Sequence, residues 1–186
     1  MSYNLWNKDM DDSVIALKSI MNTYLPKIVS GKIHQIEHID NEVLLLMDIK
    51  SGIDYIKSDS NGLQGIAARV QWESNFDTFT IRANRCTGNK TELEKRLYQI
   101  KNGYLYPYLT LQAYFDCRNN NILLSIAVIK TFDLYNLYKT QPTLFYCNSS
   151  DNDFVYVHWN DMLPYIKCIK YKPDLENTEI VGSGEF

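Results

Sequence analysis

Apolar residues recur at helical spacing near the beginning of the chain. Val14, Leu17, Met21 and Leu25 are separated by three or four positions, with mostly polar residues between them. Residues three and four apart share one face of a helix, so this spacing predicts an amphipathic helix over about residues 10–28. Lys27 near its end suits the helix dipole. We expect the apolar stripe to pack against a central sheet.

Shorter apolar runs predict a series of strands. The continuous run at 43–47 is typical of a buried strand, and further strands are expected at 53–56, 66–72 and 76–82. Short stretches of Gly, Ser and Asn separate these runs, as turns require. Residues 32–39 are compatible with either a strand or the end of a helical arm.

The second half of the chain alternates helical and strand patterns. Thr91 and Glu94 form the T-x-x-E capping box, which predicts a helix from there to about Lys101. The remaining expected elements are a hairpin of strands at 109–115 and 122–129, a short helix at 134–138, strands at 143–146 and 154–159, and a helical turn around Met162.

The order of these elements indicates a single domain of the α+β class over residues 1–181. We expect a central, mainly antiparallel or mixed sheet with flanking helices, in an αβββαβ-like order. Residues 182–186 read Gly-Ser-Gly-Glu-Phe, and we expect them to be a tail left by cloning, outside the fold. No apolar run is long enough for a membrane helix and no signal-peptide layout is present, which favours a cytoplasmic protein without a membrane partner.

Polar side chains interrupt two of the expected strands. Asp54 lies among apolar neighbours, and Arg69 and Gln71 share one face of the next strand because they are two residues apart. A buried acid requires a cation or a hydrogen-bond donor. We therefore expect Asp54, Arg69 and Gln71 to converge in one polar pocket. The alternatives are that Asp54 caps a backbone N–H near a turn, and that Arg69 and Gln71 face solvent.

The sequence of helix, antiparallel meander, helix and strand, with Asp54 on the second strand, resembles the core of the PD-(D/E)XK nuclease superfamily over about residues 9–130. The resemblance implies a divalent-metal-dependent nuclease. Mg²⁺ would be held by Asp54 together with Asp48 or Glu73, and Asp54, Arg69 and Gln71 would form the catalytic group.

The third strand departs from the family pattern. Where the family has Glu-x-Lys, this chain has Arg69-Val-Gln71 or Gln71-Trp-Glu73. Arg69 can act electrostatically but cannot act as a base at neutral pH. The resemblance is therefore also compatible with a degenerate relative that binds nucleic acid without cutting it.

Charge is distributed unevenly along the chain. The net charge is −3, but residues 65–101 hold seven Lys and Arg against four acids, a net charge of +3. A basic segment within an acidic chain suits contact with a polyanion, and Arg82, Arg85, Lys95 and Arg96 are the candidate nucleic-acid-binding residues. The alternative is a solvated helix face with neighbouring ion pairs.

A second class of function is a non-enzymatic interaction, inhibitor or immunity-type protein that binds a protein partner. Tyrosines suit such an interface. The tyrosines that we consider for it are Tyr104, Tyr106, Tyr108, Tyr114, Tyr135 and Tyr138. The distribution of Arg69, Arg82, Lys95 and Arg96 discriminates the two classes: one concave face favours a polyanion, and scattered positions favour a protein.

Other chemistries have weaker signals. His34 and His38 are four residues apart but lack the H-E-x-x-H pattern, and no two cysteines form a C-x-x-C pair. The chain has no G-x-S-x-G elbow, Walker A or G-x-G-x-x-G sequence. Without a C-x-x-C pair, we expect the cysteines to be small core residues or partly exposed thiols.

Overall fold

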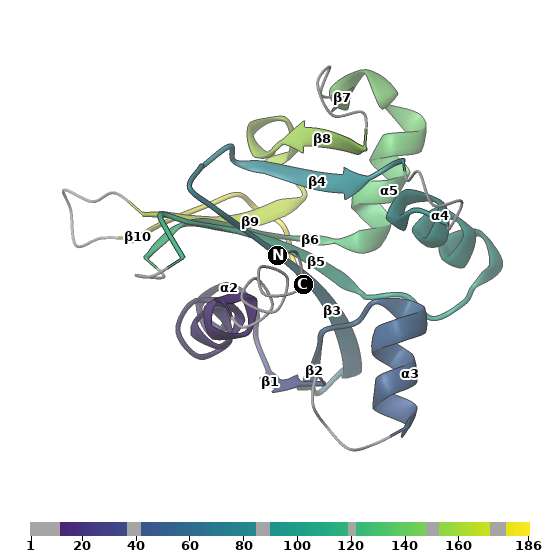
Figure 1. The fold of residues 1–186 in the computed structure, drawn as a ribbon, viewed down its shortest axis with the longest axis horizontal. Coiled ribbons are helices and arrows are strands. Elements are labelled where there is room, and N and C mark those ends of the chain that lie inside the picture. The colour runs from purple at the N-terminus through teal and green to yellow at the C-terminus, as the bar shows by residue number, and fades with distance from the viewer. Residues whose placement is uncertain (1–11, 37–41, 85–89, 119–121, 148–152, 172–177) are drawn as a thin grey trace, which may run out of the picture.

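The computed structural model describes residues 12–36, 42–84, 90–118, 122–147, 153–171 and 178–186 (Figure 1). The fold is α+β, as the sequence predicts, with two sheets and flanking helices. The larger sheet has seven strands in the order β1 (Lys32–Gln35), β2 (Tyr55–Asp59), β3 (Gly62–Trp72), β5 (Leu109–Phe115), β6 (Leu123–Lys130), β9 (Ile166–Tyr171) and β10 (Thr178–Val181). The smaller sheet has the order β4 (Thr78–Arg82), β8 (Phe154–His158) and β7 (Tyr146–Cys147).

The N-terminal helix covers one face of the large sheet. Residues 12–19 are α-helical, and a π-helical turn (Ile20–Tyr24) and α2 (Leu25–Ile28) continue the path. Leu17 and Leu25 are buried, and Met21 packs against the same core cluster. The cluster includes Ile66 and Leu111 of the sheet, so Leu17, Met21 and Leu25 of the predicted stripe pack as expected, while Val14 is partly buried outside the cluster.

The second core lies on the other face of the large sheet. There the buried side of the small sheet packs with α5 (Thr131–Thr140) and the short 3₁₀ turn Trp159–Met162. Figure 1 shows the small sheet and α4 (Glu92–Asn102) on the side of the large sheet opposite α2. No helix in the described part of the chain is long and apolar enough to cross a bilayer.

The apolar run at 43–47 is helical, so the strand expected there is wrong. It belongs to α3 (Glu42–Ser51). Leu and Met favour helices intrinsically, and Val43 is the one β-branched residue in the run. A short apolar run does not by itself separate a buried strand from a helix.

The expected strand at 76–82 exists as β4, but it does not continue the meander. Glu73 and Asp77 both adopt positive φ, at 64° and 46°, and the chain leaves the large sheet between them. Asp77 is anchored to the large sheet by Ser125 Oγ at 2.8 Å and by Lys170 Nζ at 2.6 Å. The neighbour of β3 is therefore β5, which runs parallel to it, and β4 pairs with β8 instead.

Residues 182–186 contact the folded chain. Ser183 N donates to Leu163 O at 3.1 Å, and Gly184 N donates to Ile166 O at 2.9 Å. Phe186 packs against the first core cluster. Gly182 has φ +96°, and a Cβ there would lie against the Ile166 carbonyl. Whatever their origin, these residues are therefore part of the packed structure.

Candidate functional site

Asp54 lies immediately before β2 and contacts the backbone of β3. Its Oδ2 accepts a hydrogen bond from Ala68 N at 2.6 Å, and its own N donates to Ile66 O at 2.9 Å. This is the backbone-capping contact that we considered as the alternative for Asp54. The carboxylate also lines a cavity of about 190 Å³, together with Arg69 and Glu92.

Arg69 and Glu92 form the centre of a polar network between the two sheets and the helices. Arg69 Nη2 lies 2.6 Å from Glu92 Oε2, and Arg69 Nη1 donates to Thr80 O at 3.0 Å. Glu92 Oε1 accepts from the Tyr135 hydroxyl at 3.4 Å. Burial, together with the Glu92 charge, raises the pKa of Tyr135 well above its ordinary value, so the phenol stays neutral and donates.

The Arg96 guanidinium donates to acceptors within the protein. Its side chain is 7% exposed, and it donates to Ser51 O, to Gly52 O at 3.1 Å and to Gln99 Oε1 at 2.9 Å. Burial lowers the pKa of Arg96. These contacts join the end of α3 to α4, so Arg96 has a structural role besides the nucleic-acid contact expected from the sequence.

Gln71 lines a second and larger cavity, of about 430 Å³. Thr80 lines both cavities, so they adjoin at β4. The structure thus places Asp54 and Arg69 at one cavity and Gln71 at the next one. Gln71 Oε1 is buried and has no hydrogen-bond partner among the described residues. The same holds for Nε2 of Gln112, which is 1% exposed and lines the smaller cavity.

The outer side of the small sheet carries a cluster of aromatic rings, which we call the aromatic face: Tyr146, Phe154, Tyr156 and His158. Alternation along β8 directs Val155 and Val157 to the core and the other side chains outward. Tyr146 and Tyr156 are stacked, with ring centroids 5.6 Å apart, and Tyr156 meets His158 edge to face at 5.6 Å.

Two arginines lie against the aromatic face. The Arg82 guanidinium lies 4.8 Å from the Phe154 ring centroid, and that of Arg69 lies 5.4 Å from it. Both guanidinium groups thus lie within cation–π distance of this ring, one from β4 and one from β3. Phe154, Tyr156 and His158 also line the larger cavity, so the face continues into the hollow that Gln71 borders.

The two other expected metal ligands, Asp48 and Glu73, lie in or next to elements other than β2. Asp48 lies in α3, where burial raises its pKa. Glu73 follows the far end of β3, seven residues beyond the Ile66 that contacts Asp54. No group of three or more His, Cys, Asp or Glu that suits a metal occurs among the described residues. Asp54 Oδ2 and both carboxylate oxygens of Glu92 accept hydrogen bonds from protein donors, and Mg²⁺ held by Asp54 stays a prediction.

Several residues of the site were not singled out from the sequence. In the sequence, Glu92 lies between the capping-box residues Thr91 and Glu94, and Gln112 lies within the strand expected at 109–115. Tyr114 and Tyr135, which we considered for a surface interface, are buried, because Tyr114 lies between the two sheets and Tyr135 faces the core from α5. The Phe-Val-Tyr-Val-His alternation at 154–158 was the available signal for the aromatic face.

Some expectations fall outside what the structure describes. Arg85, Cys86 and His38 are not among the described residues. His34 Nε2 lies 3.3 Å from Ser58 Oγ. Cys117, Cys147 and Cys168 are free thiols, of which Cys168 is buried.

No model of a known protein family matches this chain, and no curated protein or solved structure matches it significantly.

Proposed function

We propose that this protein binds single-stranded nucleic acid across the aromatic face and the larger cavity beside it. The observation that carries the proposal is the aromatic face itself, with Arg69 and Arg82 held against its Phe154 ring. Proteins that bind single strands combine aromatic rings, on which bases stack, with cations that follow the backbone. Both components occur here on one side of one small sheet.

The cavity beside the aromatic face supports the same ligand class. Phe76 and Gln71 border it together with Tyr156 and His158, so an apolar ring and an amide belong to the same cavity as these side chains. The partnerless Gln71 Oε1 is an acceptor that the amino group of a base can satisfy when the side chain turns toward the cavity. A volume of about 430 Å³ is suitable for a group of that size.

The arrangement of the basic side chains favours a polyanion over a protein partner. Arg69 and Arg96 line the smaller cavity, Arg96 and Lys95 line an adjoining cavity of about 160 Å³, and Arg82 lies with Arg69 at the aromatic face. Three of the four discriminating side chains thus line two adjoining cavities, and Arg82 lies beside Phe154 with Arg69. This supports nucleic acid, with Arg96 already donating to Gly52 O and Gln99 Oε1.

Cleavage of the bound strand by a divalent metal stays a prediction of the family resemblance, and a cytoplasmic location stays a prediction from the sequence. We derive no catalytic step from Asp54, Arg69 and Gln71. Incubation with DNA or RNA and Mg²⁺ or Mn²⁺ tests cleavage: cutting by the wild type but not by Asp54→Ala would establish it.

Fluorescence anisotropy with labelled oligothymidylate and oligouridylate tests the binding proposal. We expect His158→Ala and Arg82→Ala each to weaken binding about five-fold or more, because stacking contributes about 1–3 kcal/mol per base. Arg82→Ala should also reduce the salt dependence by about one charge. Tyr165→Ala is the matched control, since Tyr165 is partly exposed and borders neither cavity.

The proposal fails if neither oligonucleotide binds at low salt. It also fails if the His158 and Arg82 variants bind as well as the Tyr165 control.

A further inference from the structure

We infer that the bound strand extends beyond the aromatic face to a second stacking site formed by Tyr98 and Tyr104, so that the ligand is a strand of several nucleotides and not a single nucleotide. The inference rests on the proposed function. Its evidence is a row of adjoining cavities, a pair of exposed tyrosines at the end of that row, and lysines between them.

Four cavities adjoin one another through shared residues. The aromatic cavity of about 430 Å³ shares Thr80 with the cavity of about 190 Å³ at Asp54. That cavity shares Glu92 and Arg96 with the cavity of about 160 Å³. This one shares Lys90 and Lys95 with a fourth cavity, of about 350 Å³. The row therefore leads from β8 across β4 to the outer side of α4.

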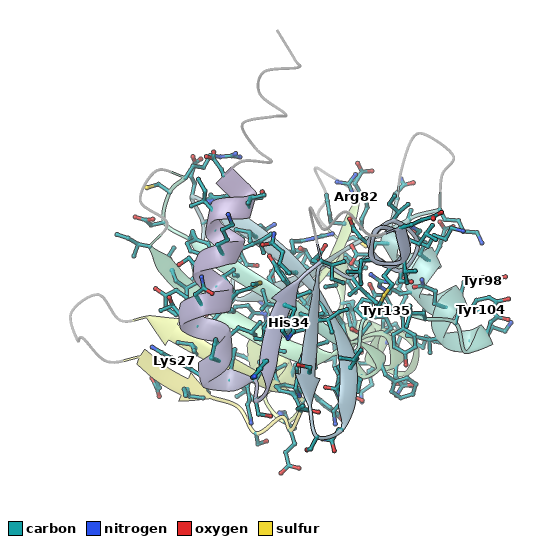
Figure 2. All side chains as sticks on the ribbon, turned by 90° about the horizontal axis from the view of Figure 1, so that it is seen from below. Lys27, His34, Arg82, Tyr98, Tyr104 and Tyr135 are labelled. Atoms are coloured by element: carbon teal, nitrogen blue, oxygen red, sulfur yellow. The ribbon has the colours of Figure 1, made fainter. Side chains whose placement is uncertain are left out.

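Tyr98 and Tyr104 border the fourth cavity. Their ring centroids are 5.7 Å apart, and the side chains are 48% and 56% exposed. Figure 2 shows the two rings together at the edge of the molecule. Neither ring contributes to the two core clusters, so packing does not account for the pair. Two adjacent exposed rings offer the surface on which bases stack.

Basic side chains connect the two aromatic sites. Lys90 Nζ lies 4.2 Å from the Tyr98 ring centroid, and Lys95 Nζ donates to Ile49 O at 3.4 Å. Lys50 borders the fourth cavity, and no acidic residue lines it. Ammonium groups beside stacked rings suit a phosphate backbone that follows the bases. Asp54 and Glu92 are the acids that line the route; Arg69 forms an ion pair with Glu92, and Asp54 Oδ2 accepts from Ala68 N.

The test measures affinity against strand length. Labelled oligothymidylates and oligouridylates of about four to about sixteen nucleotides cover the site sizes of single-strand-binding folds. We expect the double variant Tyr98→Ala/Tyr104→Ala to bind the shortest strands as the wild type does and the longest at least about five-fold more weakly. Both side chains are exposed, so the variant should fold, and thermal denaturation checks this.

Two further variants separate charge from stacking. Lys90→Ala/Lys95→Ala should reduce the salt dependence for long strands by about two charges and leave that for the shortest strands unchanged. Lys27→Ala is the control, because Figure 2 places Lys27 on the other side of the molecule from Tyr98.

The possible failures are distinct. If His158→Ala weakens all strands but the Tyr98/Tyr104 variant binds long strands normally, the second stacking site is refuted and the proposed function stands; the tyrosine pair would then be free for a protein partner. If no strand of any length binds, both proposals are refuted. If the wild-type protein binds short and long strands with equal affinity, the extended site is also refuted.

Discussion

Glu92 accepts hydrogen bonds from three different elements. Its Oε2 receives Arg69 Nη2 from β3 and, at 3.4 Å, the backbone N of Arg82 from β4, and its Oε1 receives the Tyr135 hydroxyl from α5. A single carboxylate at the first turn of α4 therefore holds the Arg69 guanidinium and the backbone of Arg82, whose side chain also lies at Phe154. The geometry of the aromatic face depends on this residue, although Glu92 does not belong to the face.

The raised pKa of Tyr135 leads us to expect that the folded protein loses stability at alkaline pH. Its pKa is raised well above 10.0 in the folded chain by burial and by the Glu92 charge, and the pKa of Tyr114 is also raised, mainly by burial. A raised pKa means that the stabilisation is fully present below the unfolded value and is lost as pH rises beyond it. The midpoint of thermal unfolding should therefore fall above about pH 10.

Tyr135→Phe is the matched variant, because it removes the hydroxyl and keeps the ring. We expect it to be about 0.5–1.5 kcal/mol less stable at neutral pH, through the lost hydrogen bond to Glu92, but to lose less stability above pH 10. Parallel pH profiles for the two proteins would contradict this assignment.

The helices and strands differ in how well their sequence patterns specify them. The capping box at α4 was readable because its four residues are contiguous, and the structure has both of its hydrogen bonds, with Gly103 in the left-handed conformation at the other end. The run at 43–47 was misread because its periodicity is ambiguous. The partner of β4 could not be read, because β8 lies more than seventy residues further along the chain.

The residues of the candidate site also divide into those that a local sequence pattern predicts and those that only pairings between distant strands bring together. Strand alternation predicts that Arg69 and Gln71 share one face, and Asp54 stands out as an acid among apolar residues. Gln112 and the aromatic face were not found, because they reach the site only through the β3–β5 pairing and the small sheet. Pairings between distant strands are set by packing and by the anchored turn at Asp77, not by any local pattern.

Thr91→Ala should destabilise the protein by about 1 kcal/mol, because Thr91 Oγ1 accepts from Glu94 N at 3.2 Å and this bond would be lost. Urea denaturation measures the effect. Thr140→Ala is a suitable comparison, since Thr140 lies at the end of α5 and its hydroxyl donates to Asn136 O in an exposed position. If the urea midpoint of Thr91→Ala equals that of Thr140→Ala, the Thr91 cap does not contribute the expected stability.

At the scale of the whole molecule, the large sheet separates two cores. The N-terminal helix covers one face, and the small sheet with α5 covers the other. The last residues of the chain pack on the first side, where Phe186 meets the core and Lys167 Nζ lies 5.7 Å from its ring centroid. The proposed ligand surface is on the second side.

Residues 182–186 are therefore expected to affect stability but not binding. Removal of these residues should lower the free energy of unfolding by about 1–3 kcal/mol, through the exposed core surface and the lost Ser183 and Gly184 hydrogen bonds. Oligonucleotide affinity should not change. Unchanged stability on urea denaturation would show that the contacts of this segment do not contribute.

The walls of the larger cavity come from two parts of the chain, residues 71–80 and residues 154–158. The β4–β8 pairing joins them, and this pairing closes one of the longest loops in the fold. A chain that has not completed this closure has half of the cavity and no complete binding surface. A ligand that binds only the complete surface stabilises the folded state relative to the unfolded state. At a ligand concentration one hundred times the dissociation constant, the free energy of unfolding rises by about 2.7 kcal/mol. Occupancy of the cavity and completion of folding are thus one linked equilibrium.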